Sequence, residues 1–180
     1  MKTKIVVAIL AISVICGFTF AGNWNADALK SKIRFDVDGP FGTVHGKFSG
    51  LKASIRFNEN DLAGSAITAS VEAGTVSTGI SLRNRDLRKK TQWFNAGKYP
   101  LIKFQSAKIQ KAGKGYIATG SLTMKGITRT IEMPFTFTNN SASGLFESKF
   151  SIKRMDYKLG NKGGSVGDVI TIILSVPVNK

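Results

Sequence analysis

The sequence has few of the residue types on which most catalytic and metal sites depend. Its 180 residues include one histidine, His45, and one cysteine, Cys16. A site built from several histidines is excluded, and so is a Cys/His nucleophile, because Cys16 lies in a segment that we expect to be removed. A Ser-His-Asp triad would have to use His45, for which we expect no nucleophile elbow. We therefore predict a protein that is not an enzyme and has no metal or other cofactor, and interpret His45 as a strand or turn residue.

Acidic side chains are also scarce. The 26 lysines and arginines outnumber 11 aspartates and glutamates, which gives a formal net charge of +15. Such an excess favours anionic partners, such as a membrane surface or an acidic ligand headgroup, although it also serves solubility alone. We expect no nucleic acid as a partner, because the N-terminal residues predict that the protein is exported.

Long apolar runs are absent except at the N-terminus. Lys2 and Lys4 precede the almost wholly apolar residues 5–18, and the segment ends in the small residue Ala21. This pattern is typical of a secretory signal peptide cleaved after Ala21, and the run is too short for a comfortable membrane span. We therefore expect a periplasmic or secreted protein.

A lipoprotein anchor at Cys16 is the competing interpretation of this segment. It is disfavoured because Ile15 precedes Cys16, where a lipoprotein signal has a small residue. Removal of residues 1–21 takes away two lysines and the only cysteine, which leaves no disulfide and no thiol chemistry. Residues 22–180 have the length of a single domain.

The remaining chain alternates apolar and polar residues with a period of two, as half-buried strands do. Eight such strands are predicted, around residues 33–37, 48–57, 67–73, 102–104, 116–124, 131–137, 146–152 and 170–176. Short turns join them, so the fold class is all-β, with an antiparallel sheet closed into a barrel or folded as a sandwich. The alternation argues against a parallel sheet buried on both faces.

Residues 83–106 interrupt this pattern between the third and fourth strands. The segment is rich in lysine and arginine and contains the aromatic pair Trp93-Phe94. Its start has good helix formers, so we predict short helical segments in this long connection. We expect Asp86 to neutralise Arg83 or Arg88.

An eight-stranded barrel has an interior that side chains can fill or that can hold one small ligand. The predicted inward residues mix large and small side chains. The large ones include Phe35, Phe48, Phe57, Phe104, Phe135 and Phe150, and the small ones are Ala53, Ala69, Ala73 and Ala118. From the residues alone, a solid core is favoured over a tunnel.

Several short motifs follow one another along the chain. They are Trp24-Asn25-Ala26-Asp27, Val44-His45-Gly46-Lys47-Phe48, Val76-Ser77-Thr78-Gly79, Trp93-Phe94-Asn95 with Lys98-Tyr99-Pro100, Gly120-Ser121-Leu122-Thr123-Met124, Arg154-Met155-Asp156-Tyr157 and Val166-Gly167-Asp168. In this order they resemble the motifs of the YceI-like family of secreted polyisoprenoid-binding proteins, over essentially the whole length after residue 22.

The resemblance implies an eight-stranded antiparallel lipocalin-like barrel, without a metal or catalytic cofactor, whose tunnel holds a long-chain isoprenoid or fatty-type lipid. It reverses the preference for a solid core, because the small inward residues become tunnel walls. The expected lining residues are Phe35, Phe48, Phe57, Val71, Trp93, Phe94, Phe104, Leu122, Met124, Met133, Phe135, Phe150 and Ile172, with Trp93 and Phe94 near the mouth. Arg83, Arg85 and Arg88 could contact an anionic headgroup or membrane surface, or solvent only.

The function that we predict is therefore non-catalytic binding, transport or storage of such a lipid. The alternative is a basic exported interaction protein with a solidly packed barrel that binds anionic surfaces or partners. A homodimer is an oligomeric state compatible with both.

Overall fold

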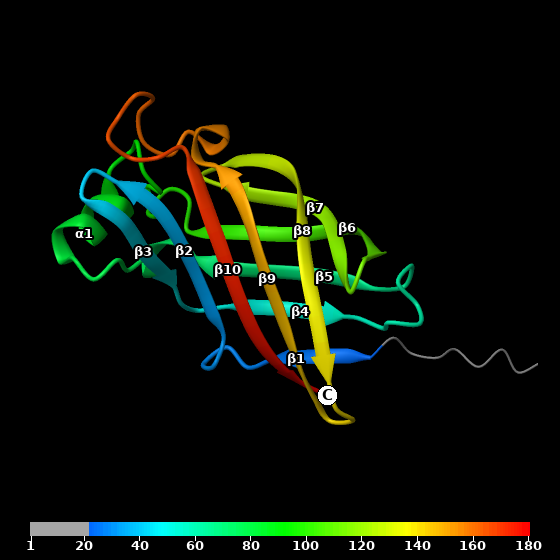
Figure 1. Cartoon of the computed structure of the whole chain (residues 1–180). Helices are drawn as coiled ribbons and strands as arrows, with labels where there is room; N and C mark the ends of the chain where they lie inside the picture. Colours follow the sequence, from blue (N-terminus) through cyan, green and yellow to red (C-terminus); the bar gives the residue numbers. More distant parts are fainter. Residues whose placement is uncertain (1–21) are drawn as a thin grey trace, which may run out of the picture.

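A computed structural model describes residues 22–180, so the expected signal peptide, with Cys16, lies outside the described residues. The strands form one antiparallel sheet that curls into a barrel (Figure 1). Their bounds are β1 (Asn23–Ala26), β2 (Lys32–Gly39), β3 (Gly42–Phe48), β4 (Lys52–Arg56), β5 (Ala66–Glu72), β6 (Leu101–Ala112), β7 (Gly115–Met124), β8 (Ile127–Asn139), β9 (Ser143–Lys153) and β10 (Val169–Asn179).

These ten strands occupy eight positions around the barrel, which we call staves. Two of the staves are each divided into two strands. β1 and β2 both pair with β10, while β4 pairs with β1 and β3 pairs with β2. Each remaining strand pairs with its neighbours in sequence, and the pairing of β10 with β1 and β2 closes the ring. The predicted eight-stranded antiparallel barrel is confirmed, whereas the sandwich alternative is not.

Local hydrogen bonds explain the break between β1 and β2. The Asp27 side chain accepts hydrogen bonds from the backbone N–H groups of Leu29 and Lys30, at 3.2 and 3.1 Å, and the Ser31 hydroxyl donates to the Asp27 carbonyl at 2.7 Å. Aspartate stabilises a turn in this way by replacing backbone partners with its own oxygens. Its hydrogen bond with the Lys30 side chain lowers the pKa of Asp27 below the usual range of aspartate.

The long connection between β5 and β6 contains the short 3-10 helix η1 (Ala73–Thr75) and α1 (Ser81–Lys89), which confirms the predicted helical segments. The prediction for Asp86 was wrong. Its carboxylate lies 2.6 Å from the Lys90 ammonium and 3.5 Å from the Arg85 guanidinium. Residues four apart on a helix lie side by side, so Lys90 is the natural partner, and its hydrogen bond lowers the pKa of Asp86.

The alternating direction of the strands gives the barrel two distinct ends. We call one the α1 end; it carries the β2–β3 turn, residues 73–100, the β7–β8 turn and residues 154–168. We call the other the terminus end; it carries residues 57–65, 113–114 and 140–142, the start of β1 and the end of β10. In Figure 1 the α1 end is at the left and upper left.

Aromatic rings fill the barrel at the terminus end. Phe57 is at the centre of this cluster, with ring centroids at 4.9 Å from Tyr116, 5.5 Å from Phe135 and 5.2 Å from Phe137. Trp24 packs edge-on against Phe137, at 5.0 Å. Edge-to-face packing of this kind adds to the free energy of burial. The solid core favoured by the residues alone therefore exists, but only in this part of the barrel.

Candidate functional site

The interior on the α1 side of the aromatic cluster contains a cavity of about 190 Å³. Only four of its lining residues are polar: Ser70, Lys103, Glu147 and Ser148. The side chains of Lys103 and Glu147 are exposed on the outer face, and the Ser148 hydroxyl donates to the Pro134 carbonyl at 2.6 Å. Burying a polar ligand group against such a wall would leave that group without a partner. The cavity therefore suits an apolar ligand.

Most of the lining residues expected from the sequence are brought together here. Eleven of the thirteen line the cavity: Phe35, Phe48, Val71, Phe94, Phe104, Leu122, Met124, Met133, Phe135, Phe150 and Ile172. The other two lie elsewhere. Phe57 is buried in the aromatic cluster, and Trp93 lies outside the cavity wall, against Gly160.

The structure adds lining residues that the prediction missed. On the strands these are Ile33, Ile55, Ile67, Ile102, Ile131, Phe146, Ile152, Ile170, Leu174 and Val176, while Ala53 and Ala69 line the cavity as the small wall residues that were expected. They share the inward face of each strand with the expected residues, so the two-residue alternation could have found them. Leu51 and Leu159 also line the cavity, but they lie between strands, where no periodicity marks them.

Small side chains make the space. Ala53 and Ala69 lie opposite each other on β4 and β5, and Ala69 faces Phe104 on β6. Two alanines side by side leave a volume that no neighbour fills, in a protein interior that is otherwise close-packed. The Phe35 ring lies directly on the backbone of Gly46, where any Cβ would collide with it. Gly46 therefore fixes the position of one wall.

Phe94 and Leu159 close the cavity at the α1 end, and we call them the cover. Both are buried, and the Phe94 ring packs edge-on against Phe48 at 5.4 Å. The backbone N–H of Gly160 donates to the Gln92 carbonyl at 2.6 Å, which joins the two segments that supply the cover. Gly160 has a φ of +74°, and a side chain there would also collide with Trp93, so only glycine fits.

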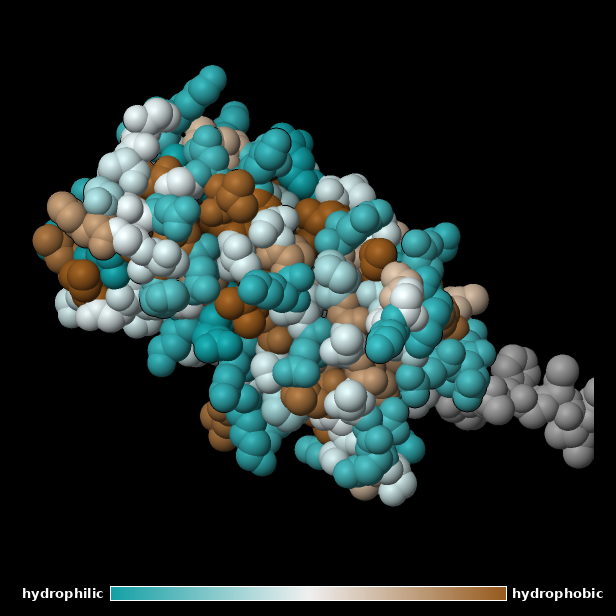
Figure 2. All heavy atoms as spheres, in the orientation of Figure 1, coloured by the Kyte–Doolittle hydropathy of each residue, from teal (hydrophilic) through white to brown (hydrophobic). Residues whose placement is uncertain are grey.

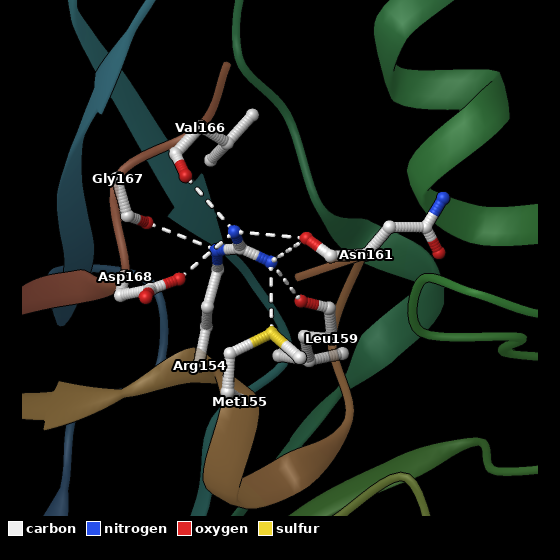
Figure 3. A network of polar contacts seen from close by, with 7 residues as sticks. All are labelled: Arg154, Met155, Leu159, Asn161, Val166, Gly167 and Asp168. Atoms are coloured by element: carbon white, nitrogen blue, oxygen red, sulfur yellow. Dashed lines mark hydrogen bonds and ion pairs between the residues drawn. The ribbon is translucent and has the colours of Figure 1, made fainter. Parts of the chain in front are cut away.

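A buried arginine holds the second of these segments in place (Figure 3). Arg154, in the 3-10 helix η2 (Arg154–Tyr157), is 2% exposed. Its guanidinium donates to the carbonyls of Gly167 at 3.0 Å, Leu159 at 2.7 Å, Val166 at 2.9 Å and Asn161 at 3.2 Å, and lies 3.0 Å from the Asp168 carboxylate. The guanidinium group is planar and has five N–H donors in fixed positions, so it can bind several acceptors at once. The sequence identified Arg154 only as part of the motif Arg154-Met155-Asp156-Tyr157, and its anchoring role was missed.

The three arginines that could contact a headgroup, a membrane surface or solvent only differ in their surroundings. Arg83 donates to the Thr78 hydroxyl at 2.7 Å and the Thr78 carbonyl at 2.8 Å, and Arg88 donates to the Val76 carbonyl at 2.9 Å. Both therefore anchor α1 to the preceding segment. Arg85 is exposed, and its guanidinium lies 3.5 Å from the neighbouring Asp86 carboxylate.

The barrel wall is incompletely paired between β8 and β9. Their register runs from Thr136 with Glu147 to Asn139 with Gly144, near the terminus end. Toward the α1 end, residues 127–135 pair with β7 and residues 148–153 pair with β10. We call this unpaired stretch the seam. An outer cleft of about 530 Å³ shares Phe135, Glu147, Ser148 and Leu174 with the cavity lining, so the wall is thin there.

Two observations bear on catalysis. Residues 163–167 read G-x-S-x-G, but Ser165 lies in the loop before β10 and not at the strand-to-helix turn that exposes such a nucleophile. His45 lies on β3, as interpreted from the sequence, and its Nδ1 is 2.7 Å from an Asp36 carboxylate oxygen on the outer face.

Within residues 22–180, no group of three or more His, Cys, Asp or Glu side chains could hold a metal ion. Within the same residues, no helix is long and apolar enough to span a membrane.

Tyr157, near Arg154, has a buried hydroxyl without a hydrogen-bond partner among residues 22–180. Burial raises the pKa of Tyr157 to about 12, and the nearby Asp156 carboxylate adds to this effect. A buried hydroxyl without a partner costs free energy relative to hydration in the unfolded chain.

We expect Tyr157→Phe to raise the free energy of unfolding at neutral pH by about 1 kcal/mol, because it removes this unpartnered group. The folded-state pKa exceeds the ordinary tyrosine value, so the wild type should lose stability as the pH rises from about 10 to about 12. Tyr157→Phe should lose less over that window. Urea unfolding at several pH values measures both effects, and equal losses in the two proteins would show that Tyr157 does not titrate as described.

Comparison with known proteins gives a consistent result. A family model described as the YceI-like domain matches residues 24–178. A UPF0312 protein of Yersinia enterocolitica is 30% identical over 139 residues, which cover 74% of this chain and 72% of that protein.

Two solved structures share the fold. Burkholderia cenocepacia BcnA superposes with a TM-score of 0.81 at 26% identity, over 85% of this chain and 99% of that one. A domain from Saccharophagus degradans, described as a polyisoprenoid-binding domain implicated in plant cell wall breakdown, superposes with a TM-score of 0.67 at 14% identity. It covers 87% of this chain and 97% of its own, and at this identity the likeness concerns the fold alone.

Proposed function

The chain belongs to the YceI-like family, and from this membership together with the apolar cavity we propose that it binds the chain of a polyisoprenoid or similar long lipid without catalysis. The observation that carries the proposal is the cavity wall, which is formed almost entirely by apolar side chains. The polyisoprenoid-binding description of the Saccharophagus degradans domain supports it by analogy. In this proposal residues 1–21 are a cleaved signal peptide, and residues 22–180 act in the periplasm or outside the cell.

The affinity in this proposal comes from buried area. Each methylene group transferred from water into an apolar site contributes about 0.8 kcal/mol. An isoprenoid consists of repeated apolar units, so a wall without polar partners holds it well and discriminates little between related chains. Phe94 and Leu159 exclude water from the α1 side of the cavity.

The size of the cavity limits how much of a chain it holds in the closed state. A cavity of about 150 Å³ takes up a molecule the size of benzene. The volume here is about 190 Å³, which corresponds to about one isoprene unit or slightly more. A longer chain therefore requires the wall to widen.

The seam is where we propose that this widening takes place. Residues 127–135 and 148–153 can part without breaking a paired ladder. The hydrogen bond from Ser148 to the Pro134 carbonyl is the contact that must give way. Met124 and Met133, which line the cavity from this side, can change rotamer because methionine adapts to irregular spaces.

A series of isoprenoid alcohols of increasing length tests this function. With geraniol, farnesol and geranylgeraniol delivered from cyclodextrin to delipidated protein, we expect the affinity to rise about tenfold or more with each added unit. Isothermal titration calorimetry gives the dissociation constants. An affinity that stops rising after geraniol would show that the wall does not widen to admit a third isoprene unit, and no binding of any of the three would contradict the proposed function.

A further inference from the structure

Exposed large apolar side chains are concentrated at the α1 end. Among residues 22–180, those that stand out are Leu29, Phe41, Ile80, Leu82 and Val169. Four of these five, all except Leu29, belong to the α1 end or the strand start that adjoins it. Phe41 is 102% exposed at the tip of the β2–β3 turn, and Leu82 is 60% exposed in the first turn of α1. Figure 2 shows hydrophobic residues at the surface around the position of α1.

The positive charge is concentrated at the same end. Residues 73–100 contain six lysines and arginines and one acidic residue, Asp86, which is already paired with Lys90. Residues 154–168 contain three basic and two acidic residues, and one of the acidic residues, Asp168, is paired with Arg154. At the terminus end, residues 57–65 contain two acidic residues and no basic one, and residues 113–114 and 140–142 add only one charged residue, Lys114. The two ends therefore differ in charge as well as in exposed apolar surface.

We propose that the α1 end docks on the surface of an anionic lipid bilayer. Phe41 and Leu82 enter the boundary between headgroups and acyl chains, while Arg85, Lys89 and Lys162, all exposed, lie among the anionic headgroups. Peripheral proteins bind membranes through this combination of inserted apolar side chains and surrounding lysine and arginine.

The arrangement fits a bilayer better than a protein partner. The apolar side chains come from separate segments, the β2–β3 turn, the start of α1 and the start of β10, and the most exposed of them project beyond the surface. A fluid bilayer accepts scattered projections of this kind. A protein partner would need a complementary surface with a contiguous, well-packed centre.

Docking in this orientation has a consequence for the cover. Phe94 and Leu159 close the cavity at the α1 end, so the bilayer would face the cover directly. A chain could then pass between the membrane and the cavity without crossing water. The docking itself does not depend on ligand binding, because Phe41 and Leu82 do not line the cavity.

Vesicle flotation tests the proposal with the protein comprising residues 22–180. We expect it to bind vesicles of phosphatidylcholine mixed with phosphatidylglycerol, and to bind vesicles of phosphatidylcholine alone much more weakly. Phe41→Ser and Leu82→Ser should each lower the partition coefficient about tenfold, since each removes one large apolar side chain from the interface. Arg85→Gln and Lys89→Gln should each lower it about fivefold at low ionic strength.

Leu29→Ser is the matched control. Leu29 is 99% exposed, but it lies in the break between β1 and β2, away from the α1 end. It should leave vesicle binding unchanged. Uptake of geranylgeraniol from cyclodextrin should be unchanged in Phe41→Ser and Leu82→Ser, so a failure of docking can be distinguished from a failure of the cavity.

A second measurement does not depend on loss of binding. A tryptophan introduced by Phe41→Trp should be quenched by brominated phospholipids in anionic vesicles, and one introduced by Leu29→Trp should not. Quenching at position 29 equal to that at position 41 would overturn the proposal. So would vesicle binding that depends on salt but is unaffected by Phe41→Ser and Leu82→Ser, because charge alone would then explain it.

Discussion

Ala69→Leu is expected to weaken lipid-chain binding about 50-fold while leaving the barrel folded. Ala69 lines the cavity opposite Ala53, so a leucine there places three further carbons where ligand carbons would lie. At about 0.8 kcal/mol for each methylene group excluded, the loss is about 2.4 kcal/mol. The free energy of unfolding should stay the same or rise by up to about 1 kcal/mol, because filling a cavity usually stabilises a protein.

Thr68→Leu provides the control on the same strand. Thr68 is the preceding residue on β5, and its side chain is exposed on the outer face. The same leucine side chain placed on the outer face should change neither geranylgeraniol affinity nor stability appreciably. If Ala69→Leu and Thr68→Leu bind geranylgeraniol equally well, as measured by calorimetry, the chain does not occupy the cavity.

Arg154→Met is expected to lower the free energy of unfolding by about 3–5 kcal/mol, because several carbonyl groups lose their donor together. Four carbonyls and the Asp168 carboxylate depend on this guanidinium. Asp168 is 59% exposed and can be hydrated, so the carbonyls account for most of the loss. Arg154→Lys should be nearly as destabilising, since an ammonium group lacks the planar fork of donors.

Loss of the Arg154 hydrogen bonds should also affect the cavity. Leu159, one half of the cover, is itself held by Arg154 through its backbone carbonyl, so a bound chain should dissociate faster from Arg154→Lys than from the wild type. Urea unfolding and stopped-flow dissociation of geranylgeraniol measure the two effects. Arg34→Met, at an exposed position on β2, is the control and should change neither. If Arg154→Met lowers the free energy of unfolding by less than about 1 kcal/mol, residues 159–168 are held by other contacts.

Much of the barrel could be predicted because alternation of apolar and polar residues reports directly on a two-faced strand. It identified the eight staves, and it placed residues such as Phe104 and Met133 on the inner face, where the structure has them lining the cavity. Alternation does not report depth along the barrel. Phe57 has the right face for a lining residue, but it lies just beyond β4 in the aromatic cluster at the terminus end.

The parts that could not be predicted depend on contacts between segments distant in sequence. The breaks that divide two of the staves come from local turns, such as the one built on Asp27, and they do not disturb the apolar pattern. Arg154 has the residue type of a surface position, and its burial becomes visible only when residues 159–168 fold around it. The hydrogen bonds of Arg83 and Arg88 to backbone carbonyls were likewise not visible from the sequence, which left these side chains open to a headgroup, a membrane surface or solvent.

The measurement that tests the account most directly is native mass spectrometry of residues 22–180, purified without detergent, delipidated and then incubated with geranylgeraniol. The apolar cavity lies inside the barrel formed by residues 22–180, so we predict one bound chain per polypeptide, and a much smaller bound fraction for Ala69→Leu under the same conditions. A spectrum that shows only the bare polypeptide after incubation would contradict it, as would a bound fraction that is the same in the wild type and in Ala69→Leu.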